Sequence, residues 1–288
     1  MVTRLKDALV DRSLTRYPVP IADAVAGLAC ADSLHEQRDR VVEVFRAVLR
    51  TLAGAVLAAR VQFGPGPGET SAEVQTLLRQ LRRRGLTDGQ WVGLVRELLR
   101  PWKDDPESHP LPQLVTAFFG RKAPLPPLLD SLLAMRKSET VAHGAAGDED
   151  DLAQVLAARV PALEALLETV EPLWEALRLV VPLSQPVDAS ERQRAWDLTG
   201  VTTARGRWRR MDLGPGVRVA PGAAVLADCE GAPMVALSPI VIVRRPSPDQ
   251  TEECFVLDGG DRKGARYVAI PSMAEHRDAD AWASLEEA

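Results

Sequence analysis

Apolar residues recur every three or four positions over most of the chain before Leu183, which is the spacing of one buried face of an α-helix. In the stretch Pro20–Arg60, Ser33 and Glu36 form the capping-box pattern that starts a helix. The glycine- and proline-rich segment Gly64–Gly68 interrupts the periodicity. Beyond it the pattern predicts helices over Val74–Leu81, Thr87–Leu99, Leu114–Phe119, Ala123–Ala142 and Leu152–Val181, the last kinked or divided at Pro161 and Pro172.

The pattern changes after Pro182, where short apolar and β-branched runs alternate with glycine and proline clusters. A polar Asp-Gly turn is expected between strands at Leu257–Gly264. We therefore predict an α+β fold, with a helical bundle over residues 1–183, a small, mainly antiparallel β domain over 184–273 and a polar tail over 274–288. The strand candidates are Val217–Val219, Ala224–Ala227, Met234–Leu237, Ile240–Val243, Cys254–Leu257 and Tyr267–Ile270.

Composition narrows the class of protein. The chain has 288 residues, of which 46% are hydrophobic and 26% charged, which is typical of a globular protein. A net charge of -5 provides no general field for non-specific nucleic-acid binding. No apolar run approaches the roughly 20 residues that span a bilayer, so no membrane partner is expected. Cysteines and histidines lack metal-ligand spacing, so we expect reduced thiols, a cytoplasmic protein, no metal and no cofactor.

One predicted helix carries a set of residues with catalytic potential. Arg136 and His143 are seven residues apart, about two helical turns, so both project from nearly the same face, with Glu139 between them. One interpretation is a solvated stripe of salt bridges. The other is RNA cleavage without a metal, in which arginine holds a phosphate and histidine acts as acid or base.

The stretch Leu132–Gly144 resembles the Arg-to-His motif of HEPN-like helical domains, with Arg136, six intervening residues, His143 and then glycine. Pro20–Leu52 resembles the leading helices of a group of bacterial HEPN-like regions. In that group a β-rich segment follows, and here it contains the sequences SPIVIV and FVLDGG. The similarity covers about Pro20–Pro271.

The resemblance implies a regulatory, sensing and dimerisation module of a bacterial signalling or anti-phage defence system, acting on an effector protein or a fused effector domain. It also implies an alternative, because in active members the Arg and His line a cleft between two protomers. That alternative is a metal-independent endoribonuclease acting as a homodimer, with Arg136 on the scissile phosphate of RNA and His143 as acid or base. Lys137 stands where active members carry Asn, Asp or His, which favours the regulatory module, although a lysine can still contact a phosphate.

The sequence contains two basic segments, and the one in the predicted β domain suggests a third function, in which that domain binds a ligand or nucleic acid. In the first, arginines alternate with an aromatic residue that could stack on a base, and the site residues would be Arg205, Arg207, Trp208 and Arg209. The competing interpretation is a strand with Trp208 inward and solvated arginines. The second segment, Leu78–Gly85, is a basic helix end whose cations suit the helix dipole. Either basic segment would support the RNA function if it faced Arg136 and His143.

Overall fold

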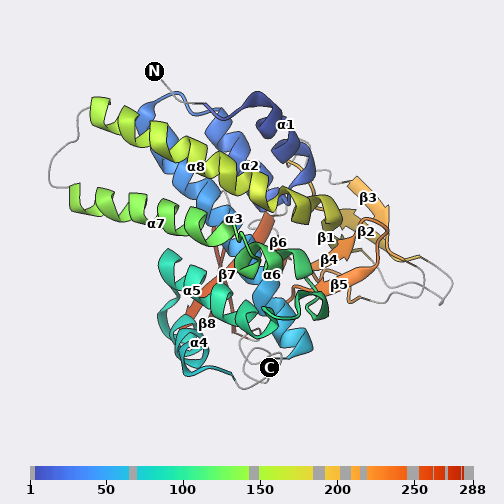
Figure 1. Cartoon of the computed structure of the whole chain (residues 1–288). Helices are drawn as coiled ribbons and strands as arrows, with labels where there is room; N and C mark the ends of the chain where they lie inside the picture. Colours follow the sequence, from blue (N-terminus) through green and yellow to red (C-terminus); the bar gives the residue numbers. More distant parts are fainter. Residues whose placement is uncertain are drawn as a thin grey trace.

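The computed structural model is α+β, as predicted, with helices dominating the first part of the chain and antiparallel sheets the second (Figure 1). It describes residues 4–64, 70–142, 149–183, 192–201, 209–214, 219–244, 253–261, 263–269, 272–279 and 281. The helices are α1 (Asp7–Arg16), α2 (Val19–Ala29), α3 (Leu34–Phe63), α4 (Ala72–Arg84), α5 (Asp88–Leu99), α6 (Pro112–Phe119), α7 (Leu125–Ala142) and α8 (Glu149–Ala176), with short 3-10 turns at Arg100–Trp102 and Pro106–Ser108.

The strands form two antiparallel sheets. The first has the order β3-β2-β1-β4-β5 and the second the order β6-β7-β8-β9, and neighbours are paired antiparallel throughout. Their bounds are β1 (Leu177–Pro182), β2 (Arg194–Asp197), β3 (Arg209–Asp212), β4 (Val225–Asp228), β5 (Pro233–Ala236), β6 (Val241–Arg244), β7 (Glu253–Asp261), β8 (Gly264–Ala269) and β9 (Glu275–Asp278).

Side chains at the helix starts explain where several helices begin. The hydroxyl of Ser33 accepts a hydrogen bond from the N–H of Glu36, as the capping pattern predicts, and Ser71 caps α4 in the same way. Thr87 and Gln90 form a complete capping box at the start of α5. These caps satisfy N–H groups that have no partner within the helix and fix where the preceding loops enter it.

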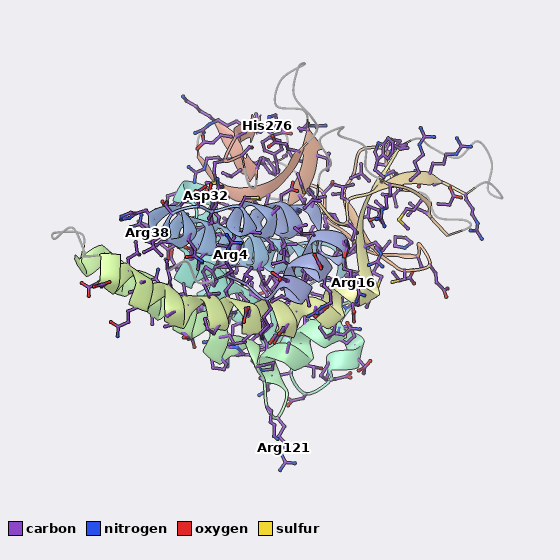
Figure 2. All side chains as sticks on the ribbon, turned by 90° about the horizontal axis from the view of Figure 1, so that it is seen from above. Arg4, Arg16, Asp32, Arg38, Arg121 and His276 are labelled. Carbon is purple, nitrogen blue, oxygen red and sulfur yellow. The ribbon has the colours of Figure 1, made fainter. Side chains whose placement is uncertain are left out.

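Helix α3 packs against other helices and against a strand of each sheet. It contacts α2, α5 and α8, and it also contacts β5 and β7 (Figure 1). Gly54 allows this approach, since a Cβ there would lie 3.3 Å from Cγ2 of Val241. Viewed from above, the helices lie between His276 on β9 and Arg121 after α6, which are at opposite sides of the molecule (Figure 2).

One cluster of buried apolar side chains runs from the helices into the second sheet. It includes Leu52, Leu94 and Trp174 from helices and Val241 and Phe255 from strands. A smaller cluster fills the first sheet around Val180, Ala195, Leu213, Val225 and Ala227. The helical layer and the second sheet therefore share a core.

Several expected boundaries are wrong. Helix α8 ends at Ala176, not near Val181, and Leu177–Pro182 is strand β1, which lies within the segment expected to be wholly helical. Its run of Leu and Val is buried on both faces of a sheet, and apolar runs of this kind suit a strand as well as a helix. Pro161 and Pro172 lie inside α8 without dividing it.

The second sheet also extends beyond its predicted limits. Strand β7 continues to Asp261, so most of the expected turn at Leu257–Gly264 is strand, and β9 lies within the segment expected to be a polar tail. Of the expected strand Val217–Val219, only Val219 is described, and it is not in a strand.

The tryptophans and cysteines differ in how deeply their side chains are buried. Trp91 and Trp174 are buried. Cys254 is buried as well, and burial raises the pKa of its thiol to about 12, which makes it a poor nucleophile. Cys30 and Cys229 are exposed, and all three thiols are free.

Candidate functional site

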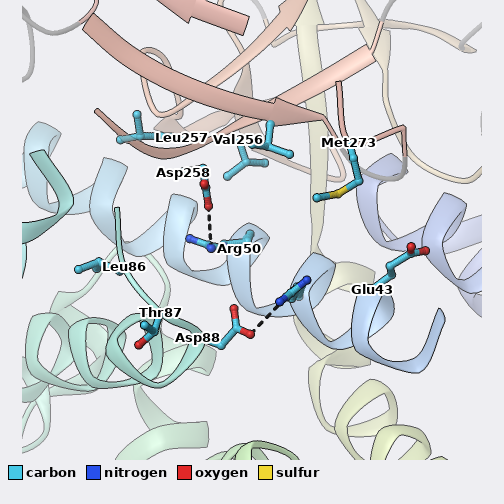
Figure 3. Close-up of a pocket in the computed structure, with 11 residues that line it drawn as sticks. Glu43, Arg50, Leu86, Thr87, Asp88, Val256, Leu257, Asp258 and Met273 are labelled. Atoms are coloured by element: carbon cyan, nitrogen blue, oxygen red, sulfur yellow. Dashed lines mark hydrogen bonds and ion pairs between the residues drawn. The ribbon is translucent and has the colours of Figure 1, made fainter. Parts of the chain in front are cut away.

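A pocket of about 330 Å³ lies where α3, the start of α5 and the second sheet meet (Figure 3). We call it the seam pocket. Its volume falls at the lower end of the range of about 300–1,000 Å³ found for small-molecule sites. One wall is mainly apolar and the other carries most of the charged groups. The lining residues are Glu43, Arg46, Arg50, Leu86, Thr87, Asp88, Val256, Leu257, Asp258, Val268 and Met273.

Helix α3 supplies one stripe of the pocket. Glu43, Arg46 and Arg50 are spaced three and four residues apart, so they share a face. The opposite faces of α3 are buried among apolar residues. This stripe is therefore the part of α3 that presents charged side chains to the seam pocket.

The connection between α4 and α5 supplies the second side. Gly85 has a φ of 79°, and a Cβ there would lie 2.6 Å from the carbonyl oxygen of Asp258. Only glycine combines that backbone angle with so close an approach to a strand. The contact places Thr87 and Asp88 opposite β7. The first turn of a helix also favours a carboxylate such as that of Asp88, because the helix dipole is positive there.

The second sheet supplies the apolar wall. Val256 on β7 and Val268 on β8 are direct cross-strand partners, and both line the pocket. A register shift follows between Leu257 and Gly259. Such irregularities redirect side chains at a site, and here the shift accompanies the acidic residue Asp258.

Ion pairs tie the three sides together. Arg50 Nη2 lies 2.7 Å from Asp258 Oδ1, which joins α3 to β7, and Arg46 Nε lies 3.2 Å from Asp88 Oδ2, which joins α3 to α5 (Figure 3). Arg266 on β8 contacts the other oxygen of Asp258 at 2.5 Å. The Asp258 side chain is 22% exposed and that of Arg50 13%, so these charges are partly shielded from water.

An aromatic ring supports one of the two arginines. The guanidinium carbon of Arg50 lies 4.6 Å from the ring centre of Trp91, which is buried in α5. This cation–π contact and the ion pair together hold the Arg50 side chain in one position. A preformed arrangement of this kind can orient a ligand without first having to be ordered.

The predicted catalytic residues are placed only in part. The backbone of Arg136 and Lys137 lies in α7, which is helical to Ala142, as expected. Their side chains are outside the part of the chain that the structure describes, and so is the whole of His143.

The predicted basic patch is also only partly described. Arg205, Arg207 and Trp208 lie outside the described residues. Arg209 is exposed on the edge strand β3, and the guanidinium of its neighbour Arg210 lies 5.4 Å from the ring centre of Trp196. The second basic segment is the end of α4, which packs on β7 and α5.

The seam pocket was not predicted from the sequence. Arg46 and Arg50 interrupt the apolar pattern of α3 at helical spacing, which is the one local signal of a charged stripe. The sequence predicts a polar turn at Asp258, but this residue lies in β7 between two arginines. Its role could not be found locally, because its partners are more than two hundred residues earlier and on the next strand.

Comparison of the chain with known family models, with curated proteins and with solved structures gave no match. None of the described helices is both long and apolar enough to cross a bilayer. Among the described residues there is also no group of three or more His, Cys, Asp or Glu side chains arranged to hold a metal ion.

Proposed function

We propose that this chain is a sensing module that binds a small molecule in the seam pocket. The observation that carries the proposal is that the two ion pairs in the wall, Arg46–Asp88 and Arg50–Asp258, join three separate elements. A ligand that touched these groups would change how α3, α5 and the second sheet are held together. Binding could then shift the molecule between arrangements that differ in those contacts.

The lining indicates the ligand class. The acids Glu43, Asp88 and Asp258 stand beside Arg46 and Arg50, so the charges of the wall nearly balance. Such a wall favours a zwitterionic or an uncharged, hydrogen-bonding molecule over a strongly charged one. The apolar side, with Val268 and Met273, favours a ligand that also has an apolar body.

Thermal unfolding in the presence of amino acids, nucleosides and nucleoside monophosphates tests this proposal. A ligand at a hundred times its dissociation constant stabilises the folded state by about 2.7 kcal/mol, so we expect a zwitterionic or uncharged panel member to raise the unfolding temperature. Val268→Phe fills the pocket and should abolish the shift. Val243→Phe makes the same change on β6, outside the pocket, and should retain it. A shift that survives Val268→Phe, or a panel without effect, would count against the proposal.

The wider role follows from the HEPN-like resemblance. We propose that the sensing module regulates a bacterial signalling or defence effector and pairs with a second copy of itself. Size-exclusion chromatography with light scattering, performed with and without the stabilising compound, tests the pairing. A monomer under both conditions would contradict it.

A ribonuclease is the second candidate, favoured by one observation. Helix α7 is continuous from Leu125 to Ala142, so it includes Arg136 and ends next to His143. RNA cleavage in EDTA by wild type, by His143→Ala and by the control His35→Ala tests it. The ribonuclease requires cleavage that persists in EDTA and is lost only in His143→Ala. A folded protein that cleaves no RNA would contradict the ribonuclease, and the sensing module would be the remaining proposal.

A further inference from the structure

Helix α4 concentrates positive charge within an acidic protein. The chain has a net charge of -5, yet the 13 residues of α4 contain four arginines and a single acid, Glu73. The arginines are Arg79, Arg82, Arg83 and Arg84. Three of them lie in the last turn, where the helix dipole favours cations. Arg79 lies before that turn, so the dipole does not account for the whole set.

The packing of α4 directs part of this charge outward. Val74, Leu77 and Leu81 form its buried face, which packs on β7 and α5. Arg79 and Arg83 are four residues apart on the opposite face and both are exposed. Like charges at this spacing destabilise a helix by a few tenths of a kcal/mol. The helix carries that cost without a structural benefit to its own packing.

The arginines also border a hollow in the surface. This hollow has a volume of about 420 Å³ and is lined by Thr76, Arg79, Gln80, Arg83 and Arg84. Within the part of the chain that the structure describes, the Arg79 guanidinium donates to the carbonyl oxygen of Gln75 and to the hydroxyl of Thr76, both within α4. They are neutral acceptors, so they leave its charge uncompensated.

We propose that the outer face of α4 binds the phosphate backbone of a nucleic acid. Guanidinium groups hold phosphate oxygens through paired hydrogen bonds, and hydroxyl and amide side chains such as those of Thr76 and Gln80 commonly add backbone contacts. Arg79 and Arg83 are offset by about 6 Å along the helix axis, so they can contact separate phosphate groups of one strand. The hollow has no apolar side chain in its lining, which disfavours insertion into a lipid surface.

This site differs from the one suggested by the sequence around Arg209. Arg209 and Arg210 lie on β3 in the first sheet, whereas α4 packs on the second sheet. The proposal is also independent of the seam pocket, because none of the arginines of α4 lines it. Either proposal can therefore fail while the other stands.

Fluorescence anisotropy with a labelled single-stranded RNA and the matching DNA, measured over a series of salt concentrations, tests the α4 site. The test variant is Arg79→Gln, Arg83→Gln and Arg84→Gln combined. The control is Arg4→Gln, Arg121→Gln and Arg194→Gln combined, which removes the same charge from exposed positions outside α4. Thermal unfolding confirms that both variants are folded.

We expect the α4 variant to bind at least tenfold more weakly at low salt. We also expect the slope of log affinity against log salt to fall by about 2, since each phosphate contact with a single strand contributes about 0.7. The control should bind like wild type. Loss of binding in the control alone, unchanged binding by the α4 variant, or wild-type binding to anionic phosphatidylserine vesicles without binding to either oligonucleotide would overturn the proposal.

Discussion

At the scale of single residues, the seam pocket depends on two glycine backbones in contact. A Cβ on Gly85 would lie 2.6 Å from the carbonyl oxygen of Asp258, and one on Gly259 would lie 2.6 Å from Cα of Gly85. Both residues also have backbone angles that L side chains rarely adopt, with φ of 79° and 154°. The entry to α5 is therefore fitted to the surface of β7 without room for a methyl group.

We predict that Gly85→Ala lowers the free energy of unfolding by about 1–3 kcal/mol, because it adds backbone strain and a collision with a main-chain oxygen. Chemical denaturation measures the loss. Gly93→Ala is the matched control, since Gly93 lies inside α5 with nothing within 4 Å of its added Cβ. That change should stabilise the protein by about 0.5–1 kcal/mol through helix propensity. Equal effects of the two substitutions would contradict the close fit.

His109 is a buried histidine with 5% of its surface exposed. Its Nδ1 accepts a hydrogen bond from the N–H of Leu111 at 3.0 Å. Burial lowers the pKa of its imidazole from 6.5 to about 4. The unfolded chain therefore takes up a proton at this residue between pH 6.5 and 4, whereas the folded chain does not. The stability that His109 contributes is complete above about pH 6.5 and is lost as the pH falls through that window.

His109→Asn removes the titration and keeps a hydrogen-bond acceptor for Leu111. We expect the free energy of unfolding of this variant to fall less steeply between pH 7 and pH 4.5 than that of wild type. Urea denaturation at a series of pH values measures the slope. His35→Asn, at an exposed position, should keep the wild-type slope. A His109→Asn slope equal to that of wild type would show that the imidazole does not cause the loss.

At the scale of elements, one carboxylate joins the helical layer to the second sheet. Asp258 accepts from Arg50 on α3 and from Arg266 on its own sheet. We predict that Asp258→Asn destabilises the protein by about 2–3 kcal/mol, because it removes a negative charge that contacts two partly buried guanidinium groups. Asp130→Asn removes an exposed ion pair to Arg96 and should cost at most about 1 kcal/mol.

Denaturant unfolding of both variants measures the difference in their free energies of unfolding. Ligand binding in the seam pocket should change as well. Loss of the Arg50–Asp258 pair should weaken the binding of any compound that wild type binds in the seam pocket, whereas Asp130→Asn should leave that binding unchanged. A destabilisation by Asp258→Asn no larger than that by Asp130→Asn would mean that the bridge is as solvent-screened as a surface pair.

The elements that the sequence revealed are those whose signal is local. Helix α5 is an example, since Thr87 marks its cap and its apolar residues recur at helical spacing, and both features lie within a dozen positions. Strand β1 was missed because Leu177–Pro182 continues the apolar run of α8, and only pairing with β2 and β4 distinguishes it. The seam pocket was missed for a related reason, because it exists only where three elements from distant parts of the chain meet.

At the scale of the whole molecule, the shared core argues against independent unfolding of the two predicted domains. Helix α3 contacts α2, α5 and α8 on some sides and β5 and β7 on another, so the same helix completes the packing of both layers. Leu52 and Val56 on α3 belong to the same buried cluster as Val241 and Phe255 in the second sheet. Removing either layer would expose apolar side chains of the other to water, at a cost of about 25 cal/mol for each Å² uncovered.

We therefore predict a single cooperative unfolding transition. Native-state hydrogen exchange tests it, because amides of α3 and α5 and amides of β7 and β8 should open with the same free energy and the same response to denaturant. Calorimetry should give one peak, and a fragment ending at Leu183 should lack cooperative unfolding, since it loses the strands that cover α3. Two peaks, or earlier exchange confined to β7 and β8, would show that the sheet is a separate unit. In that case a ligand in the seam pocket would act between two separately folded units, instead of within one shared core.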